Sequence, residues 1–459
     1  MQSWVLLFGW IGYAALASGC IWFFLTCLHE RRGRAARVAA AGFTPILIVA
    51  AGLLIVNFPG RSWIVLALLI GASLTAILLT LPLGENSPLR IVGEQARVDE
   101  RDGIFHRFLR LEPGTDDFAA HYAQHPEQRE FDDAVRAMPQ LAQPGGKAYH
   151  PLTAPFSSAI FEVLEGMTRD IDREPAPSEG APVHASVEEF TERIKGFARY
   201  LGADLAGTTK LNPAYVYSHI GRSPGPWGAP IALEHTHAVA IGVEMRHEMI
   251  RHAPDSPTLA ASARGYFETG KVALLVARYI NRLGYEARAH VDGNYRVLCG
   301  PIAVDAGLGE LGRLGLLMTP RFGPSLRLSV VTTTLPLAQD EPIGFGVQDF
   351  CAICRKCARN CPAGAIPAGE KGVHRGVEKW QSDQETCYRF WRAQGTDCAI
   401  CIKVCPYAHP RTPLHNLVRK LIARNRLARR AALWGDDLFY GRRPKDRSAP
   451  PPWHAKTQD

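Results

Sequence analysis

Eight of the eleven cysteines lie between residues 351 and 405, and their spacing constrains the fold more tightly than any other feature of the chain. The first run begins at Cys351 and reads CxxCxxCxxxCP, which is the spacing of bacterial ferredoxins. The second begins at Cys387 and, after a gap of ten residues, continues from Cys398 as CxxCxxxCP. In such repeats three thiolates of one loop bind one cubane, and the fourth cysteine binds the other.

This pattern predicts two [4Fe–4S] clusters that pass electrons. Structural zinc is the alternative, but zinc sites pair two CxxC motifs and do not use a CxxCxxC run followed by Cys-Pro. The predicted ligands of the first cluster are Cys351, Cys354, Cys357 and Cys405, and those of the second are Cys361, Cys387, Cys398 and Cys401.

Three long apolar runs open the chain, at residues 4–28, 43–58 and 63–83. A helix that spans the hydrocarbon core of a bilayer needs about 20 apolar residues. The first and third runs reach this length, whereas the second is near the lower limit and contains Pro45. The first run lacks the charged start of a signal peptide and is too long for its apolar core. We therefore predict three transmembrane helices, with a buried helical hairpin of a soluble core as the alternative.

Basic residues predict the orientation of these spans. The loop after the first run holds four arginines, whereas the loop after the second holds only Arg61. Because cytoplasmic loops are enriched in Lys and Arg, the first loop is expected on the cytoplasmic side. The net charge of +8 also fits a membrane surface as partner. The prediction is a multi-pass protein of the cell inner membrane, with residues 84–459 in the cytoplasm.

The remaining sequence predicts a mixed α/β or α+β core. Residues 84–185 are polar and form a covering region of short helices in this interpretation. Ser186 is placed to cap a helix over 186–204, and a second helix is predicted over 256–283. Strands are predicted at 205–211, 238–245, 301–307 and 326–337. The predicted domains are an anchor (1–84), a covering region (85–185), a reductase domain (186–340), the two-cluster module (341–412) and a basic tail (413–459).

Residues 413–434 of the tail predict one basic amphipathic helix. Its apolar face could pack on the two-cluster module, with the arginines in solvent, or the helix could lie on the anionic inner leaflet of the membrane. A nucleic-acid partner is the weakest interpretation, and none is predicted.

Several long motifs resemble corrinoid-dependent reductive dehalogenases, a family related to the epoxyqueuosine reductases. The similarity covers most of residues 95–445. It is carried by RVDERDGIFHR (97–107), LGADLAGTTKLNPAYVYS (201–218), PIAVDAGLGELGRLGLLMTPRFGPSLRLS (301–329), FCAICRKCARNCPAGAI (350–366), CYRFWRAQGTDCAICIKVCP (387–406) and WGDDLFYGRRP (434–444). The resemblance implies a nitroreductase-like, corrinoid-binding core with a ferredoxin-like module.

The resemblance also implies a cobalamin-type corrinoid without a protein ligand to cobalt, bound in part by a loop with Gly307, Gly309 and Gly312. These glycines also spell GxGxxG, the fingerprint of a dinucleotide site. That fingerprint needs an acid about 20 residues later, and the window 327–335 contains none. A plain tight turn is the simpler alternative.

Three residues match the family's substrate pocket. Tyr266, after Gly265 on the predicted long helix, would donate a proton; Arg327 would polarise it and lower its pKa; Asn294 would line the pocket. Without the resemblance, Tyr266 reads as a core tyrosine, Arg327 as an exposed strand residue and Asn294 as a turn residue. Glu268 lies close to Tyr266, and epoxyqueuosine reductases use a carboxylate as their proton donor.

The resemblance implies a membrane-anchored oxidoreductase that removes halide from an organohalide. Two electrons would pass through the clusters to the corrinoid, whose cobalt would be reduced to Co(I). The expected partners are membrane lipid and an electron donor, either a quinol or a reductase. The alternatives are a related corrinoid reductase acting on a non-halogenated substrate such as an epoxide, and a ferredoxin-like electron carrier without enzymatic activity.

Overall fold

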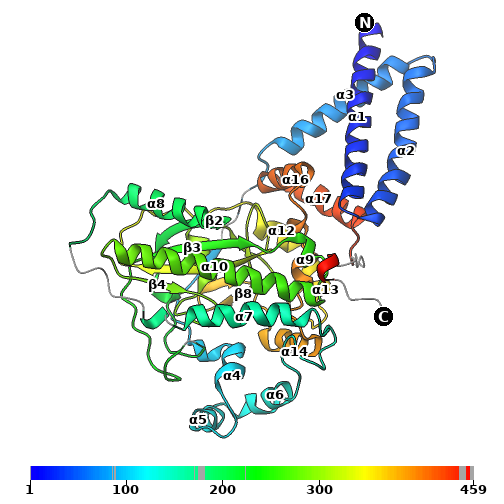
Figure 1. Ribbon diagram of the computed structural model, residues 1–459. Helices are drawn as coiled ribbons and strands as arrows, with labels where there is room; N and C mark the ends of the chain where they lie inside the picture. Colours follow the sequence, from blue (N-terminus) through cyan, green and yellow to red (C-terminus); the bar gives the residue numbers. More distant parts are fainter. Residues whose placement is uncertain are drawn as a thin grey trace. The chain divides into compact units, whose positions relative to one another are not determined.

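The computed structural model describes residues 2–84, 86, 89–169, 171–173, 181–222, 224–443 and 451–454. The chain folds into two compact units, each of which joins distant parts of the sequence (Figure 1). One contains Met1–Asn86 and His409–Ser448, and the other contains Ser87–Ala408 and Ala449–Asp459. The first unit is called the anchor unit and the second the cluster unit below.

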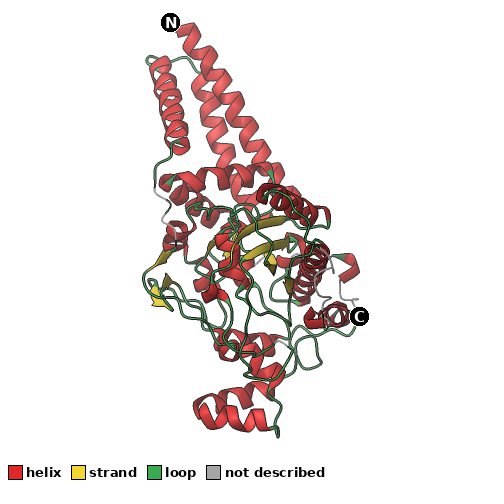
Figure 2. Ribbon diagram, turned by 90° about the vertical axis from the view of Figure 1, so that its left-hand side faces the viewer, coloured by secondary structure: helices red, strands yellow, loops and turns green. Residues whose placement is uncertain are grey.

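Three long helices dominate the anchor unit: α1 (Gln2–His29), α2 (Gly33–Ile55) and α3 (Arg61–Thr80) (Figure 2). All three are long and apolar enough to cross a membrane. The helix α2 begins ten residues before the predicted run, because the Ala-rich stretch after Gly33 favours helix. The helical segment therefore includes Arg34 and Arg37, which the sequence placed in a loop.

The basic tail forms two helices, α16 (Pro413–Arg424) and α17 (Arg426–Phe439), so the prediction of one continuous helix was wrong. The chain breaks at Asn425, whose side-chain oxygen accepts hydrogen bonds from two amides of the first turn of α17. Its amide group donates to the carbonyls of Leu78 and Leu81 at the end of α3, at 2.7 and 2.8 Å. An Asn that caps one helix and satisfies the last carbonyls of another fixes both helix ends.

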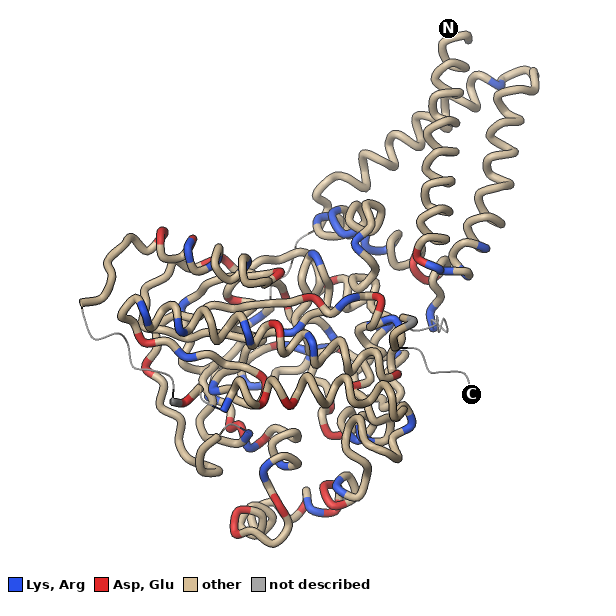
Figure 3. The backbone as a smooth tube through the Cα atoms, viewed as in Figure 1, with Lys and Arg blue, Asp and Glu red and all other residues tan. Residues whose placement is uncertain are grey.

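The tail helices belong to the anchor unit, where α17 contacts α2 and α16 contacts α3. Two of the arginines assigned to the solvated face, Arg419 and Arg429, are buried. Figure 3 shows Lys and Arg gathered beside these helices and at the turn between α1 and α2. The opposite turn, between α2 and α3, carries only Arg61. This asymmetry agrees with the predicted orientation, which remains a prediction.

A four-stranded antiparallel sheet forms the core of the cluster unit, with the strand order β2-β3-β7-β4. These strands are β2 (Leu205–Lys210), β3 (His237–Glu244), β7 (Leu326–Thr333) and β4 (Ala287–His290). The long helix α10 (Ser256–Arg282) covers one face and the short helix α11 (Cys299–Asp305) covers the other. Alternate residues of β3 point to opposite faces, so Val239 packs under α10 and Ala240 under α11.

The structure confirms the predicted helix over 256–283 and three of the four predicted strands. It also confirms that Ser186 caps the helix α8 (Val187–Tyr200), because its hydroxyl accepts from the amide of Glu189 at 3.1 Å. The strand predicted at 301–307 was wrong, because this apolar stretch belongs to α11. A short apolar run without periodicity cannot distinguish a buried helix from a strand. Short helices do form in the covering region, as predicted.

The remaining elements of the cluster unit are short, apart from α7 and α8. The helices are α4 (Ile104–Arg110), α5 (Asp116–Gln124), α6 (Pro126–Arg136), α7 (Ala154–Thr168), α8 (Val187–Tyr200), α9 (His247–Ile250), α12 (Val347–Cys354), α13 (Lys356–Asn360), α14 (Gln384–Gln394) and α15 (Ile400–Lys403). The strands are β1 (Arg90–Ile91), β5 (Glu310–Leu311), β6 (Leu317–Met318), β8 (Gly372–His374) and β9 (Val377–Lys379).

Candidate functional site

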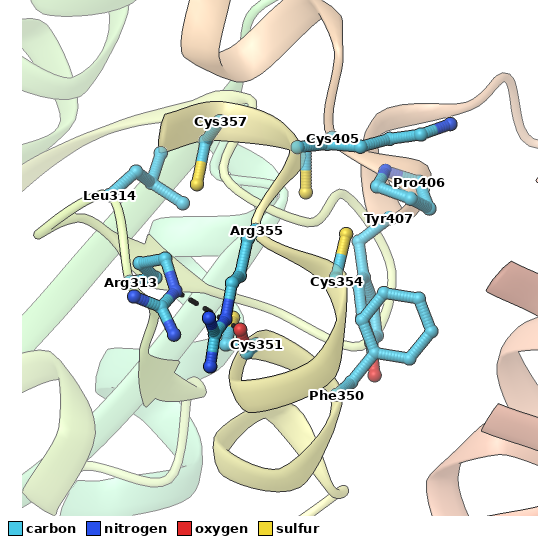
Figure 4. A pocket seen from close by; sticks show the side chains of 11 residues that line it. Arg313, Leu314, Phe350, Cys351, Cys354, Arg355, Cys357, Cys405, Pro406 and Tyr407 are labelled. Atoms are coloured by element: carbon cyan, nitrogen blue, oxygen red, sulfur yellow. Dashed lines mark hydrogen bonds between the residues drawn. The ribbon is translucent and has the colours of Figure 1, made fainter. Parts of the chain in front are cut away.

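The four cysteines predicted for the first cluster surround one cavity in the cluster unit. Cys351 and Cys354 lie on α12, Cys357 on α13, and Cys405 just after α15. Figure 4 shows the sulfur atoms of Cys354, Cys357 and Cys405 around a common space. Within the described part of the chain, no three His, Cys, Asp or Glu side chains are placed to hold a single metal ion. Four thiols around an open space fit a cubane cluster instead.

Arg313 fixes the wall of this cavity. Its guanidinium is fully buried and donates to the carbonyl of Cys351 at 3.0 Å and to those of Pro367 and Gly369 (Figure 4). It also lies over the ring of Trp380, with 4.3 Å to the centroid. A buried cation beside four thiols favours thiolates and would offset the negative charge of a ligated cluster.

Burial raises the pKa of the Cys351 and Cys357 thiols to about 12, and neighbouring cysteines add to the effect. The pKa of the Cys405 thiol is raised further for the same reasons. Such thiols stay protonated at neutral pH without a metal. The positive charge of iron is therefore what would make them ligands.

The four cysteines predicted for the second cluster also lie close together. Cys361 directly follows α13, Cys387 lies in α14, Cys398 lies two residues before α15 and Cys401 lies in α15. Burial raises the pKa of Cys387, Cys398 and Cys401, and the charge of Cys361 raises the pKa of each of these thiols further. The charge of Cys357 from the first set also raises the pKa of Cys401, so the two sets of cysteines are neighbours. Their roles as ligands remain predictions.

A second cavity, of about 150 Å³, lies at the end of the sheet in the same unit. Its polar lining consists of Tyr266 from α10, Arg327 from β7, Tyr295 and Cys299. The rest of the wall is apolar and contains Leu316, Leu317, Pro324, Leu326 and Leu328. The structure thus brings together two of the three residues predicted for the substrate pocket.

Arg327 is held by two partners beside Tyr266. One of its terminal nitrogens lies 2.9 Å from Asp397 Oδ2 and also donates to the hydroxyl of Ser262, which in turn donates to Asp397. The guanidinium carbon lies 4.9 Å from the centroid of the Tyr266 ring. The side chain of Arg327 is only 14% exposed, so it is not the solvent-facing residue that the simpler interpretation expected.

Gly265 explains how the arginine reaches this position. A Cβ atom on residue 265 would lie 2.8 Å from Cγ of Arg327, which is closer than real side chains approach. The glycine before Tyr266 therefore leaves room for the stem of Arg327 as it crosses α10.

The prediction of a lowered pKa for Tyr266 was wrong. Burial raises the pKa of Tyr266 above its ordinary value of 10.0, although the charge of Arg327 opposes this shift. Desolvation raises the pKa of this phenol by more than the nearby cation lowers it, and the burial that causes it is a property of the folded chain. Tyr266 is therefore neutral at physiological pH and keeps its proton.

Asn294 does not line this cavity. Its side-chain oxygen accepts from Arg288 at 2.5 Å, and its amide group donates to the carbonyl of Thr168 and to Asp172, both at 3.3 Å. The residue next to it, Tyr295, reaches the cavity instead. Glu268 forms an ion pair with Lys271 at 2.5 Å and is not among the residues that line the cavity.

Sequence reasoning missed several polar groups of this site. Tyr295 and Cys299 line the cavity. Arg222 and Asp292 form an ion pair at 3.0 Å. The charge of Asp292 raises the pKa of Tyr266 and of Tyr295, and the charge of Arg222 lowers both. Asp397 was missed although it directly precedes a predicted cluster ligand. No local pattern marks these residues, because they come from segments that are far apart in the chain.

Gly307, Gly309 and Gly312 pack against the chain itself. Added Cβ atoms would meet the backbone oxygens of Glu341 and Met318 and the side chain of Met318, at 2.7, 2.0 and 2.7 Å. These glycines are therefore required by the turn that leads into β5 and β6. Their contact with a corrinoid remains a prediction.

Comparison with known proteins agrees with this geometry. Residues 350–409 match the family model of the 4Fe-4S dicluster domain. The tetrachloroethene reductive dehalogenase of Sulfurospirillum multivorans is 33% identical over 306 residues, which cover 59% of this chain and 60% of that protein. The chain thus spans less than two thirds of this relative's length.

Solved structures of reductive dehalogenases share the fold. The catabolic reductive dehalogenase NpRdhA superposes with a TM-score of 0.64 at 28% identity, over 78% of this chain and 48% of that one. A reductive dehalogenase structure described in terms of B12-dependent dehalogenation gives a TM-score of 0.62 at 27% identity, over 78% and 49% of the two chains. By sequence, by fold and by its two-cluster module, the chain is similar to the reductive dehalogenases.

Proposed function

We propose that this protein is a membrane-anchored reductive dehalogenase that removes halide from an organohalide. The reaction consumes two electrons and one proton: R–X + 2e⁻ + H⁺ gives R–H + X⁻. The observation that carries the proposal is the cavity in which a proton-bearing Tyr266 lies beside Arg327. Arg327 is itself paired with Asp397, the residue before Cys398 of the two-cluster module. The substrate pocket and the electron carrier are thus joined through one ion pair.

The relatives' B12 dependence supports a corrinoid next to this cavity. The residues present fit such a group, because Leu316, Leu317, Pro324, Leu326 and Leu328 provide an apolar wall. When bound, the corrinoid supplies low-valent cobalt, Co(I), as the two-electron reductant of the carbon–halogen bond.

In this proposal the protein supplies the proton and the charge around it. The hydroxyl of Tyr266 donates its proton to the carbon from which the halide leaves. The phenolate that results is stabilised by the guanidinium of Arg327, which Asp397 and Ser262 hold in place. Tyr266 then regains a proton from solvent. Burial of the site strengthens the interaction between the phenolate and the arginine.

The anchor unit would attach this reductase to the inner membrane. Three helices that could span the bilayer, and the basic residues grouped at one end of them, support a lipid partner and a cytoplasmic catalytic unit. Electrons would then come from a donor in or at the membrane, such as a quinol or a reductase.

The proposal is tested with Tyr266→Phe, reconstituted with iron, sulfide and cobalamin and assayed with an organohalide and a chemical reductant. Loss of a general acid is expected to lower turnover by about 10²–10⁴-fold. The matched control is Tyr279→Phe, on the same helix, whose ring packs on Phe197 in the core. Iron and cobalt analysis should give about eight irons and one cobalt per chain in all variants. Full activity of Tyr266→Phe with both cofactors retained would remove the proton-donor role.

A further inference from the structure

A second group of ionisable side chains is buried in the anchor unit, where α1 ends. The imidazole rings of His409 and His415 are stacked, with 4.7 Å between centroids and 9° between planes. Each has a carboxylate partner: His409 Nε2 lies 2.6 Å from Asp436 Oδ1, and His415 Nε2 lies 3.1 Å from Glu30 Oε1. The hydroxyl of Tyr440 lies 3.3 Å from His415 Nε2. These five residues are called the histidine network.

The network is enclosed and surrounded by charge. Glu30, His415 and Asp436 are less than 10% exposed. Two buried arginines face it: Arg419 donates to the backbone carbonyl of His409, and the guanidinium of Arg32 lies 5.9 Å from the ring centroid of Tyr440. Burying this many ionisable groups beside transmembrane helices is costly, and such groups usually serve ion or proton transfer.

Two features of the network bear on proton transfer. Burial lowers the pKa of His409 to about 4 in spite of its contact with Asp436, so the ring is neutral at physiological pH and releases an added proton readily. The second oxygen of Glu30, Oε2, is buried and has no hydrogen-bond partner among the described residues. The network thus contains a neutral imidazole and a carboxylate oxygen, both able to receive a proton from a hydroxyl group.

Aromatic rings adjoin the network. Phe23 of α1, Phe43 of α2 and Phe439 of α17 have ring centroids 4.6 to 6.0 Å apart, and all three are half-buried. Phe439 directly precedes Tyr440. Two of the three rings come from candidate membrane spans, so a planar aromatic molecule dissolved in the lipid could reach the histidine network by stacking on them.

The chain itself keeps the network close to a cluster ligand. Only residues 406–408 separate Cys405 from His409. Because one residue spans at most about 3.5 Å, the Cα atoms of these two residues lie within about 14 Å of each other. That is short enough for electron tunnelling.

We propose that the histidine network is a quinol-oxidation site at which a lipid-soluble quinol delivers electrons to the [4Fe–4S] clusters. The inference rests on the proposed function only in taking dehalogenation as the reaction that uses these electrons. The quinol breaks two O–H bonds and leaves as the quinone. It gives one electron to each of the two clusters and one proton to each pair of histidine and carboxylate, His409 with Asp436 and His415 with Glu30.

The reverse reaction provides the test, because it requires neither corrinoid nor organohalide. The full chain in lipid nanodiscs, with its clusters reduced by dithionite, is mixed with menadione, and cluster reoxidation is followed by visible absorbance. Reoxidation is expected to slow at least tenfold in His409→Asn and in Glu30→Gln. It should be unchanged in His29→Gln, a matched variant of an exposed histidine beside Glu30. Ferricyanide, which is water-soluble, should reoxidise all four proteins at the same rate.

Equal rates with menadione in all four proteins would overturn the proposal. If His409→Asn does not fold, Glu30→Gln and the binding of menadione to the cluster-free protein, measured by tryptophan quenching, decide the question. No saturable binding, or binding that Glu30→Gln leaves unchanged, would also overturn it. Failure of the proposed dehalogenase function would appear separately, as absence of turnover with a chemical reductant.

Discussion

The polar network around Tyr266 and the histidine network at the end of α1 are built on different basic side chains. The first holds Arg327 between Asp397 and Ser262, and the second pairs His409 with Asp436 and His415 with Glu30. Both lie largely out of solvent. An arginine keeps its charge at every pH that a protein tolerates, whereas a histidine gains or loses a proton near neutrality.

The difference indicates two tasks. A fixed positive charge beside Tyr266 can stabilise a phenolate each time the tyrosine gives up its proton, without itself taking part in proton exchange. A neutral imidazole backed by a carboxylate can take up a proton and release it again. The first arrangement suits a site that supplies a proton to substrate, and the second suits a site that collects protons from a donor.

Among the variants that test this comparison, the largest effect is expected for Asp397→Asn. It would break the network of Arg327, Asp397 and Ser262. Removing one partner of a buried ion pair costs about 3–5 kcal/mol of unfolding free energy. Turnover should fall at least tenfold, because Arg327 loses the group that orients it. The anion of Asp397 also raises the pKa of Tyr266, so the alkaline limb of the pH–rate profile should move to lower pH in this variant.

The control for Asp397→Asn is Glu248→Gln. Glu248 forms an exposed ion pair with Arg246 at 3.6 Å, and exposed pairs contribute only about 0–1 kcal/mol. A pH profile of Asp397→Asn that matches that of the unaltered protein would mean that Asp397 has only a structural role.

An intermediate effect is expected for the histidine network in acid. The pKa of His409 is lowered in the folded state, from 6.5 to about 4, so the folded protein favours the neutral ring. The stability contributed by this group is complete above pH 6.5 and is lost as the pH falls toward 4. At about 1.4 kcal/mol per unit, the loss is on the order of 3 kcal/mol.

Thermal unfolding of the detergent-solubilised chain between pH 7 and pH 4 measures this loss. The melting temperature of His409→Gln should depend less on pH over this interval than that of the unaltered protein. Arg327 keeps its charge throughout this range, because its pKa is raised above its already high ordinary value. Identical slopes for the two proteins would contradict the assignment of a buried neutral His409.

The smallest effect is expected for Gly265→Ala. The added methyl group would lie 2.8 Å from Cγ of Arg327 and would displace the arginine from Tyr266. Overpacking of this kind costs about 1–3 kcal/mol, partly offset by up to about 1 kcal/mol because alanine favours the helix. We expect turnover to fall several-fold. Gly196→Ala in α8, where no atom lies within 4 Å of the added methyl group, should stabilise the protein and leave turnover unchanged.

The sequence by itself determined the parts of this protein that follow local rules. Cysteine spacing predicted which thiols would meet, because CxxC steps place sulfurs on one tight loop. Apolar length predicted the three helices α1, α2 and α3, since a bilayer sets the length of a span. Periodicity and a capping serine predicted α10 and α8. The family motifs pointed to Tyr266 and Arg327, which do share one cavity.

Only the tertiary structure decided what depends on distant segments. Asp397 is 70 residues from Arg327, and His415 is 385 residues from Glu30, so no local pattern pairs them. Asn294 matched a motif yet turned toward Arg288, because side-chain direction depends on packing around the turn. The pKa of Tyr266 rose and did not fall, because burial is a property of the folded chain. Residue types and spacing fixed which chemistry was possible, and long-range packing decided which groups face one another.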